Sequence, residues 1–280
     1  MSDRISNPNK QSRVGPRRIT FDTNQDDCNM YCIMCEEHSE FSPLKQERIR
    51  TGRPHRIMDI GIIRKTVNEM APLGLKEIIP STMGEPLLYE HFLDIIDICR
   101  ENGIKLNLTT NGTWPRYGAR KWAEMICPVA SDVKISWNGS NSAVQESIMK
   151  GSLFNIRLHD LTEFIEVRDS ISKRGGNRCR VTLQATFMES NASDLPSLVK
   201  LAIDLGIDRV KGHQLWAHIP EIKNLDIRRS TESASHWNRT VEMCHEIAET
   251  YKLSNGKHIM LENFNYIPEN DNYDMPSDWE

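Results

Sequence analysis

The chain has 280 residues, of which 38% are hydrophobic and 26% charged, and its formal net charge is −4 at pH 7. This length suits one main domain, and the negative charge offers no general attraction to nucleic acid. No run reaches the roughly 18 apolar residues of a membrane span, and the polar N-terminus lacks the apolar stretch of a secretory signal, so we expect a cytoplasmic protein with no membrane partner.

Short β-branched or apolar runs recur along the chain, bounded by Gly, Asn or Asp. We expect six strands, at residues 17–22, 76–81, 104–110, 132–137, 180–187 and 208–216. The stretches between them carry apolar residues at helical spacing. Asp59 and Asp194 stand at expected helix N-caps. Gly103 and Gly206 stand where helices are expected to end. The alternation favours a parallel sheet, either doubly wound or curled into a barrel.

The first predicted strand is followed at once by the segment "CNMYCIMC", which contains Cys28, Cys32 and Cys35. In a parallel α/β protein, the loops at the carboxyl ends of the strands form the functional face. The total of seven cysteines is odd, which favours thiols or metal ligands over a disulfide framework. This loop is therefore the first candidate site.

Three chemistries are candidates for three neighbouring thiols. A structural zinc takes four protein ligands, and His38 is a candidate for the fourth, with an unusual spacing. A redox disulfide uses two cysteines and leaves the third surplus. An iron–sulfur cube has four irons, so three thiolates leave one iron open for an exogenous ligand. The cysteine spacing alone leaves these alternatives open.

The cysteine segment resembles the three-cysteine loop of the radical S-adenosylmethionine (radical SAM) superfamily, and later strand ends agree with it. The segment "STMGEPLLY" resembles the superfamily's Gly-Gly-Glu-Pro segment, with Met83 in place of the first glycine and with Gly84 and Glu85 retained. "LTTNGT" resembles its Thr-Asn-Gly turn. "VKISWNG" resembles its Ser-x-Asp-Gly strand, with Ser136 retained and Asn138 replacing the aspartate.

This resemblance covers residues 17–250 and implies a partial (β/α)6 barrel that holds a [4Fe-4S] cluster and S-adenosylmethionine (SAM). It implies that the cluster ligands, the catalytic residues, are Cys28, Cys32 and Cys35. The implied SAM contacts come from strand ends: Met34, Gly84, Glu85, Ser136, Gln184 and Leu215. These residue types suit SAM, which needs an acid or carbonyls for its ammonium group, polar groups for its ribose and an apolar surface for its adenine.

The resemblance also implies an activity. A radical SAM enzyme cleaves SAM reductively at its cluster, and the resulting 5'-deoxyadenosyl radical abstracts hydrogen from a substrate. An electron donor such as flavodoxin or ferredoxin is the implied partner. We expect a ribosomally made peptide as substrate, to be epimerised or cross-linked, with a sugar, nucleoside or other small molecule as the alternative. A further hypothesis is a non-catalytic cysteine-metal binding or scaffold protein, against which the retained Gly84, Glu85 and Ser136 argue.

Other residues have weaker claims to function. His213 and His218 flank "QLWA" after the sixth predicted strand, as substrate contacts or surface residues, and Trp216 is expected to pack. The basic run at residues 48–56 is expected to be a solvated loop, with binding of an acidic peptide or phosphate as the alternative. Cys99, Cys127 and Cys244 are expected to be core thiols, and Cys179 an inert thiol or a hydrogen donor.

The domain organisation is expected to be a flexible tail at residues 1–16, the barrel at 17–252, and a C-terminal tail or the start of another domain at 253–280. Segments such as "CEEHSEFSPL" and the closing "MPSDWE" resemble the branch of the superfamily that continues into a cysteine-rich SPASM or twitch domain. Auxiliary clusters cannot be built here, because Cys244 is the only cysteine after Cys179. We therefore expect a short natural member, or a chain whose downstream part is separate or missing.

Overall fold

The computed structural model describes residues 15–81 and 83–269. Within these residues, seven strands form one parallel sheet in which spatial order equals chain order. The strands are β1 (Arg18–Thr20), β2 (Glu77–Ile79), β3 (Lys105–Thr110), β4 (Ala130–Ser136), β5 (Arg180–Phe187), β6 (Arg209–Gln214) and β7 (Met260–Glu262). The six predicted strands are all present, and β7 is an additional one.

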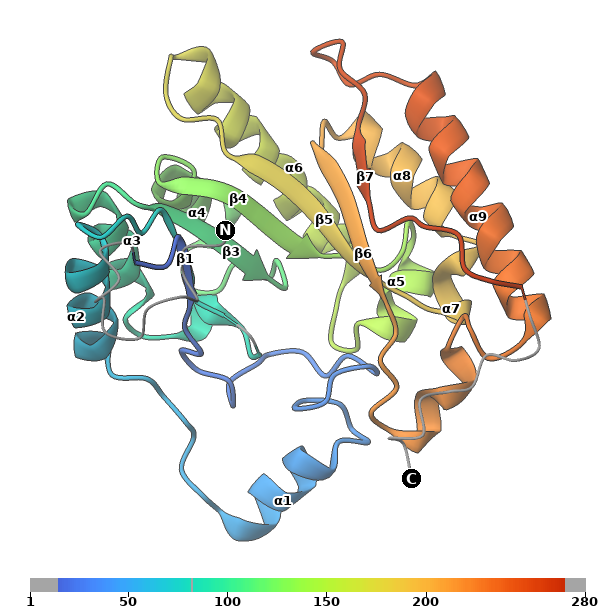
Figure 1. The fold of residues 1–280 in the computed structure, drawn as a ribbon, viewed down its shortest axis with the longest axis horizontal. Coiled ribbons are helices and arrows are strands. Elements are labelled where there is room, and N and C mark those ends of the chain that lie inside the picture. Colours follow the sequence, from blue (N-terminus) through green and yellow to red (C-terminus); the bar gives the residue numbers. More distant parts are fainter. Residues whose placement is uncertain (1–14, 82, 270–280) are drawn as a thin grey trace, which may run out of the picture.

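The strand order identifies a barrel rather than a doubly wound sheet. A doubly wound sheet reverses its order at a switch point, whereas here each strand pairs with the next along the chain. Because crossovers between parallel strands are right-handed, an unbroken order places the connecting helices on one face. In Figure 1, α2 and α3 lie beside the β1 edge of the curved sheet, and α8 and α9 lie beside the β7 edge. The expected partial (β/α) barrel is therefore confirmed.

Helices of varied length connect the strands. They are α1 (Pro43–Thr51), α2 (Ile60–Met70), α3 (Phe92–Glu101), α4 (Gly118–Ile126), α5 (Ser142–Ile148), α6 (Phe154–Lys173), α7 (Glu189–Ala192), α8 (Leu195–Asp204) and α9 (Thr231–Thr250), with short 3₁₀ helices η2 (Pro86–Leu88) and η3 (Pro220–Leu225). None of the helices in the described part of the chain is long and apolar enough to cross a bilayer.

The predicted helix boundaries are mostly confirmed. Asp59 caps α2, accepting the Gly61 N–H at 2.6 Å. Gly103 and Gly206 follow α3 and α8 in the left-handed region, at φ +61° and +73°. Asp194 precedes α8, but its side chain does not cap that helix.

Alternation along the strands sorts apolar and polar side chains onto the two faces of the sheet. On β4, Val133 and Ile135 are buried in the core that the helices share. Lys134 and Ser136 lie on the opposite face and are half-buried. Gln184 on β5 pairs with Ser136 across the strands, so it shares this face. The concave side of the barrel is therefore polar.

Among the described elements, β7 and α1 were not predicted, and neither were α5, α7 and the two 3₁₀ helices. β7 pairs with β6 and has only three residues, none of them β-branched, unlike the equally short β1 and β2. α1 overlaps the basic run, which was expected to be a solvated loop, at residues 48–51. That expectation is wrong for α1, because Ser42 caps a helix there and Arg48 is only 8% exposed. The predicted tail at residues 1–16 lies almost wholly outside the described residues, as does "MPSDWE".

Candidate functional site

The cysteine loop, residues 28–35, follows β1 at the carboxyl ends of the strands, at the bottom of Figure 1. Two backbone hydrogen bonds anchor it to the connection between α5 and α6. The Tyr31 N–H donates to the Lys150 carbonyl at 3.1 Å, and the Ile33 N–H donates to the Ile148 carbonyl at 3.0 Å. The three thiols of this loop are free and half-buried. The fold thus presents three thiols at the functional edge of the sheet.

The environment of these thiols favours metal binding over nucleophilic catalysis. Burial raises the pKa of Cys28 to about 12 and raises the pKa values of Cys32 and Cys35 as well. A reactive thiol needs a lowered pKa, whereas a bound metal deprotonates a thiol outright. The sulfurs therefore become thiolates only when positive charge is placed among them.

The spacing of the sulfurs bears on which metal group fits. Among the described residues, these three sulfurs are not all within 4.8 Å of one another. Thiolates around one tetrahedral zinc lie about 3.8 Å apart, given Zn–S distances of about 2.3 Å. The Nε2 atom of His38, the candidate fourth zinc ligand, lies 2.9 Å from the Gln25 carbonyl oxygen. The structure therefore does not bring the three sulfurs and His38 together as the closed set of four ligands that a structural zinc takes.

The segment after β2 packs against the residues that lead into the cysteine loop. Gly84 has φ +73°, and a Cβ there would lie 2.4 Å from the Asn24 carbonyl oxygen and 2.8 Å from that of Asp27. Only glycine meets both constraints. The Glu85 N–H donates to the Asp27 carbonyl at 2.7 Å, and Asn24 Nδ2 donates to the Glu85 carbonyl at 2.9 Å. The segment and the loop therefore form one unit.

The Glu85 carboxylate is completely buried and faces the end of β3. It accepts hydrogen bonds from the Leu87 N–H at 3.1 Å, the Thr110 hydroxyl at 2.7 Å and the Asn111 N–H at 2.6 Å. Burial raises its pKa to about 7, against the effect of these donors. With protein donors on both oxygens, this carboxylate positions the turn after β3.

Asn111 connects that turn to the cysteine loop. Its Nδ2 donates to Asn29 Oδ1 at 2.7 Å and lies 3.8 Å from Cys28 Sγ. Its Oδ1 accepts from the Thr113 N–H at 3.0 Å. The sequence predicted the "LTTNGT" turn without assigning Asn111 a role, although an amide before glycine at a strand end was a usable signal.

Arg157 on α6 is a buried cation that sequence reasoning missed. Its guanidinium donates to the carbonyls of Asn111 and Ser136, at 2.7 Å for Ser136, and lies 4.6 Å from the Trp137 ring centre. Burial lowers its pKa to about 10, opposed by the charges of Cys32 and Glu85. Among the described residues, Arg157 Nε has no hydrogen-bond partner. A buried donor without a partner, next to Ser136, is a place for an anionic group.

The remaining predicted SAM contacts fall into two groups. Met34 and Leu215 line a cavity of about 200 Å³ at the strand ends. Its other lining residues are Cys35, Glu36, Met83, Thr186, His213, Trp216 and His218. Ser136 and Gln184 are paired across β4 and β5 and are not among the lining residues of this cavity. The structure therefore brings the two apolar candidates together beside Cys35, with the two polar ones on neighbouring strands.

The structure also places the histidines, the tryptophan and the cysteine that have weaker claims to function. His213 and His218 line the cavity. Trp216 was expected to pack, and it stacks on His218 with ring centres 5.2 Å apart, although it is 63% exposed. Cys179 is buried beside Cys127, before β5 and thus at the opposite end of the sheet from the cysteine loop. It has the environment of an inert thiol.

A family model described as the radical SAM superfamily matches residues 25–202, which include the cysteine loop and the ends of β2 to β5. The chain belongs to the radical SAM superfamily. A curated relative from Pyrococcus furiosus, the tungsten-containing aldehyde ferredoxin oxidoreductase cofactor-modifying protein, is 22% identical over 242 residues, which are 85% of this chain and 60% of that protein.

Solved structures show the same fold. Streptococcus suis SuiB bound to SAM has a TM-score of 0.63 at 15% identity, covering 90% of this chain and 51% of SuiB. The protein anSMEcpe with bound SAM has a TM-score of 0.60 at 13% identity, covering 88% of this chain and 63% of anSMEcpe. The chain therefore spans about half to two-thirds of the length of these proteins.

Proposed function

We propose that this chain is a radical SAM enzyme that holds a [4Fe-4S] cluster on Cys28, Cys32 and Cys35. The observation that carries the proposal is the arrangement of the loop. Three half-buried thiols, which do not form a closed set of ligands for one ion, are joined through Gly84 and Glu85 to the ends of β2 and β3. Three thiolates leave one iron of a cube open for another ligand.

The surroundings of the loop fit SAM group by group. The backbone of residues 83–85 lies against the loop, where carbonyl oxygens suit the ammonium group of SAM. Arg157 supplies buried positive charge for its carboxylate. Ser136 and Gln184 offer polar groups for the ribose, and the cavity at Met34 and Leu215 offers an apolar surface for adenine. In this proposal the Glu85 carboxylate acts on SAM indirectly, by positioning these elements.

The bound cluster would supply one electron to the sulfonium of SAM, releasing methionine and the 5'-deoxyadenosyl radical that takes hydrogen from the substrate. The residues of the chain orient SAM and shield this radical from water. Leu215 is only 1% exposed, and Met34 and Met83 cover the same cavity. The electron would come from a small carrier protein such as flavodoxin or ferredoxin.

A peptide is the first proposed substrate, for epimerisation or cross-linking. Two solved neighbours support it: SuiB was crystallised with its precursor peptide SuiA, and anSMEcpe with a cysteine-containing peptide. A small molecule is the second candidate, because the relative from Pyrococcus furiosus is named for modifying a cofactor. The exposed stack of Trp216 and His218 at the rim of the cavity offers an aromatic surface to either.

Anaerobic reconstitution with iron and sulfide tests the proposal. We expect about four irons and four sulfides per chain, and slow formation of 5'-deoxyadenosine when SAM and a reductant are added. Alanine at any one of Cys28, Cys32 and Cys35 should abolish iron binding. As matched controls, Cys99→Ala and Cys244→Ala should retain it, because both thiols are buried in the core. One tightly bound zinc without sulfide would contradict the proposal.

Incubation with candidate substrates separates the two substrate classes. Mass spectrometry of reduced protein with SAM and peptide should show a peptide of unchanged mass for epimerisation, or two hydrogens lighter for a cross-link. A change of stereochemistry is read in deuterium oxide, where an epimerised residue gains deuterium if the returned hydrogen comes from an exchangeable donor. Modification of small molecules alone would favour the second candidate.

A further inference from the structure

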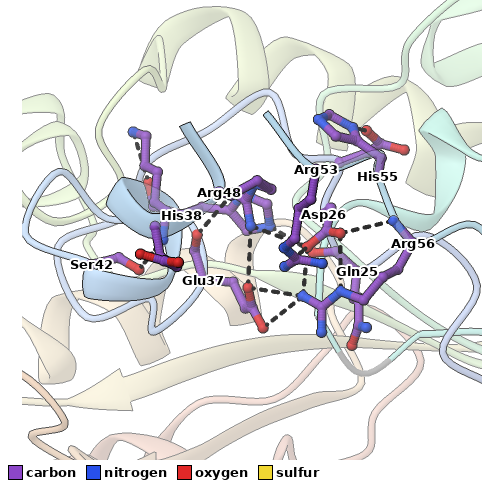
Figure 2. A network of polar contacts seen from close by, with 12 residues as sticks. Gln25, Asp26, Glu37, His38, Ser42, Arg48, Arg53, His55 and Arg56 are labelled. Carbon is purple, nitrogen blue, oxygen red and sulfur yellow. Dashed lines mark hydrogen bonds and ion pairs between the residues drawn. The ribbon is translucent and has the colours of Figure 1, made fainter. Parts of the chain in front are cut away.

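The segment between the cysteine loop and α2 folds back onto both ends of that loop. Figure 2 shows four side chains at the centre of this contact: Asp26, Glu37, Arg48 and Arg56. We call these four residues the arginine clamp. Asp26 stands two residues before Cys28, and Glu37 stands two residues after Cys35. The clamp therefore joins the chain just before the first cysteine to the chain just after the last.

Arg48 bridges the two carboxylates from α1. Its Nη1 donates to Asp26 Oδ1 at 3.1 Å and to Glu37 Oε2 at 3.3 Å, and its Nη2 donates to the Glu37 carbonyl at 3.2 Å. The side chains of Asp26, Glu37 and Arg48 are at most 9% exposed. Charge-assisted bonds between buried groups of this kind are strong and directional.

Arg56 bridges the same two carboxylates from the chain that follows α1. Its Nε donates to Asp26 Oδ2 at 2.9 Å, and its Nη2 donates to Asp26 Oδ1 at 2.5 Å and to Glu37 Oε1 at 3.2 Å. Its backbone N–H also donates to Asp26 Oδ2, at 2.8 Å. Arg53 adds a longer contact to Asp26 at 3.4 Å. Three guanidinium groups, those of Arg48, Arg53 and Arg56, thus face the two carboxylates.

The rest of α1 explains why the clamp is not ordinary core packing. Arg48 is the buried residue of this helix, and its apolar members Leu44 and Ile49 are 40% and 72% exposed. Figure 1 shows α1 apart from the other helices, on the side of the cysteine loop. A helix that buries a cation and exposes its apolar side chains is held by that cation rather than by hydrophobic contact. The helix serves to deliver Arg48 to the loop.

We propose that Arg48 and Arg56 are positioning residues for the iron–sulfur cluster, an inference that rests on the proposed function. The clamp fixes the two ends of the loop, and so holds Cys28 and Cys35 at the separation the cluster needs. Arg48 and Arg56 also place positive charge beside a cluster that carries net negative charge with three thiolates, and this charge favours the reduced form. Reduction potentials of such clusters depend on nearby charge and hydrogen bonding.

This assignment also answers the question raised by the basic run in the sequence. Two arginines of that run already bind two carboxylates of the same chain, so neither is available to an acidic peptide or a phosphate. The neighbouring Arg50 differs, since it is exposed and pairs with Glu47 on the same helix. Arg50 is therefore the natural control for the clamp.

The test compares Arg48→Met with Arg50→Met in reconstituted protein. Arg48→Met should release iron to a chelator about 10- to 100-fold faster than the parent protein, as expected when a residue that supports metal ligands is lost. It should also shift the midpoint potential of the cluster, measured by redox titration with electron paramagnetic resonance, to a more negative value. Arg50→Met should leave both unchanged.

Arg48→Lys separates the two effects. Lysine retains the positive charge but lacks the planar guanidinium group that donates to two carboxylates. Arg48→Lys should therefore have the midpoint potential of the parent protein, while its iron release stays as fast as in Arg48→Met. Arg56→Gln is the milder variant, because this side chain is 41% exposed, and it decides the matter if Arg48→Met does not fold. The inference would be overturned if Arg48→Met kept the midpoint potential and the iron-release rate of the parent protein. If Arg48→Met does not fold, the same result in Arg56→Gln would overturn it. Parent protein that assembles no cluster would overturn the proposed function instead.

Discussion

The carboxylate of Glu85 accepts a hydrogen bond from the backbone N–H of Asn111 at 2.6 Å, joining the segment after β2 to the turn after β3. Asn111 in turn contacts Cys28 and Asn29 with its amide group. One buried acid thus connects two strand ends to the cysteine loop. The position of the loop therefore depends on a carboxylate that is not itself a ligand to metal.

The first prediction follows from the pKa of Glu85, which burial raises to about 7. Because the folded protein binds this proton more tightly than the unfolded chain, the contribution of Glu85 to stability is greatest below about pH 4.5 and is lost as pH rises towards 7. The free energy of unfolding of the parent, minus that of Glu85→Gln, should fall by roughly 3 kcal/mol over this range. Denaturant titrations at several pH values measure it.

Glu77 provides the control for this titration. Its burial raises the pKa, but hydrogen bonds from Ser131, Asn107 and Arg18 outweigh that effect, and the pKa of Glu77 is lowered. Its stabilising contribution is therefore fully present above its unfolded value and is lost only in more acidic solution. The difference between parent and Glu77→Gln should stay constant from pH 5 to 8. An equally flat profile for Glu85→Gln would show that its carboxyl group is not desolvated as described.

The strands and the site segments were predictable because their signals are local. Three cysteines after a strand, and a glycine beside an acid after the next strand, lie within short stretches of sequence. Arg157 has no such signal. It is separated by 46 residues from Asn111, and only the packing of α6 against the strand ends brings the two together. Likewise, Glu85 could be placed near the site, but two of its three donors, Thr110 and Asn111, are brought to it by the tertiary fold.

The role of the basic run at residues 48–56 could not be predicted from sequence for the same reason, because its partners are distant along the chain. In sequence, Arg48 is one of several exposed-looking cations, and burial of a cation is uncommon without a partner. Its partners are 22 and 11 residues away, at Asp26 and Glu37. β7 was missed for a different reason, since its three residues include no β-branched one, unlike those of the equally short β1 and β2.

The second prediction uses the close approach at Gly84. Gly84→Ala should lower iron loading, because the added Cβ would displace the carbonyls of Asn24 and Asp27, which precede the cysteine loop. Gly52→Ala is the control, with a similar φ of +61° and nothing within 4 Å of its Cβ. Both changes cost about 1–2 kcal/mol of backbone strain, so only the difference between them reports the steric effect. Equal iron content in the two variants would contradict the prediction.

The third prediction concerns the apolar wall of the cavity. Met34→Ala should weaken SAM binding by about 1–2 kcal/mol through lost contact area, with iron content unchanged. Ile33→Ala is the matched control, since Ile33 is adjacent in sequence but is not among the lining residues of the cavity. Calorimetry on reconstituted protein measures both dissociation constants. If Ile33→Ala had the larger effect, adenine would have to bind elsewhere.

The last prediction compares two buried arginines on one helix. Arg157→Met should weaken SAM binding by about 1.5–3 kcal/mol, because a charged hydrogen bond to the carboxylate of SAM would be lost. Arg168, also on α6, is 1% exposed but lies at the other end of the sheet, where it pairs with Asp208 at 2.8 Å. Arg168→Met should therefore lower the melting temperature without changing the SAM dissociation constant. Both variants remove a buried guanidinium group. If both weakened SAM binding equally, the cause would be a general loss of stability. Only a loss of SAM affinity confined to Arg157→Met assigns this residue to the ligand.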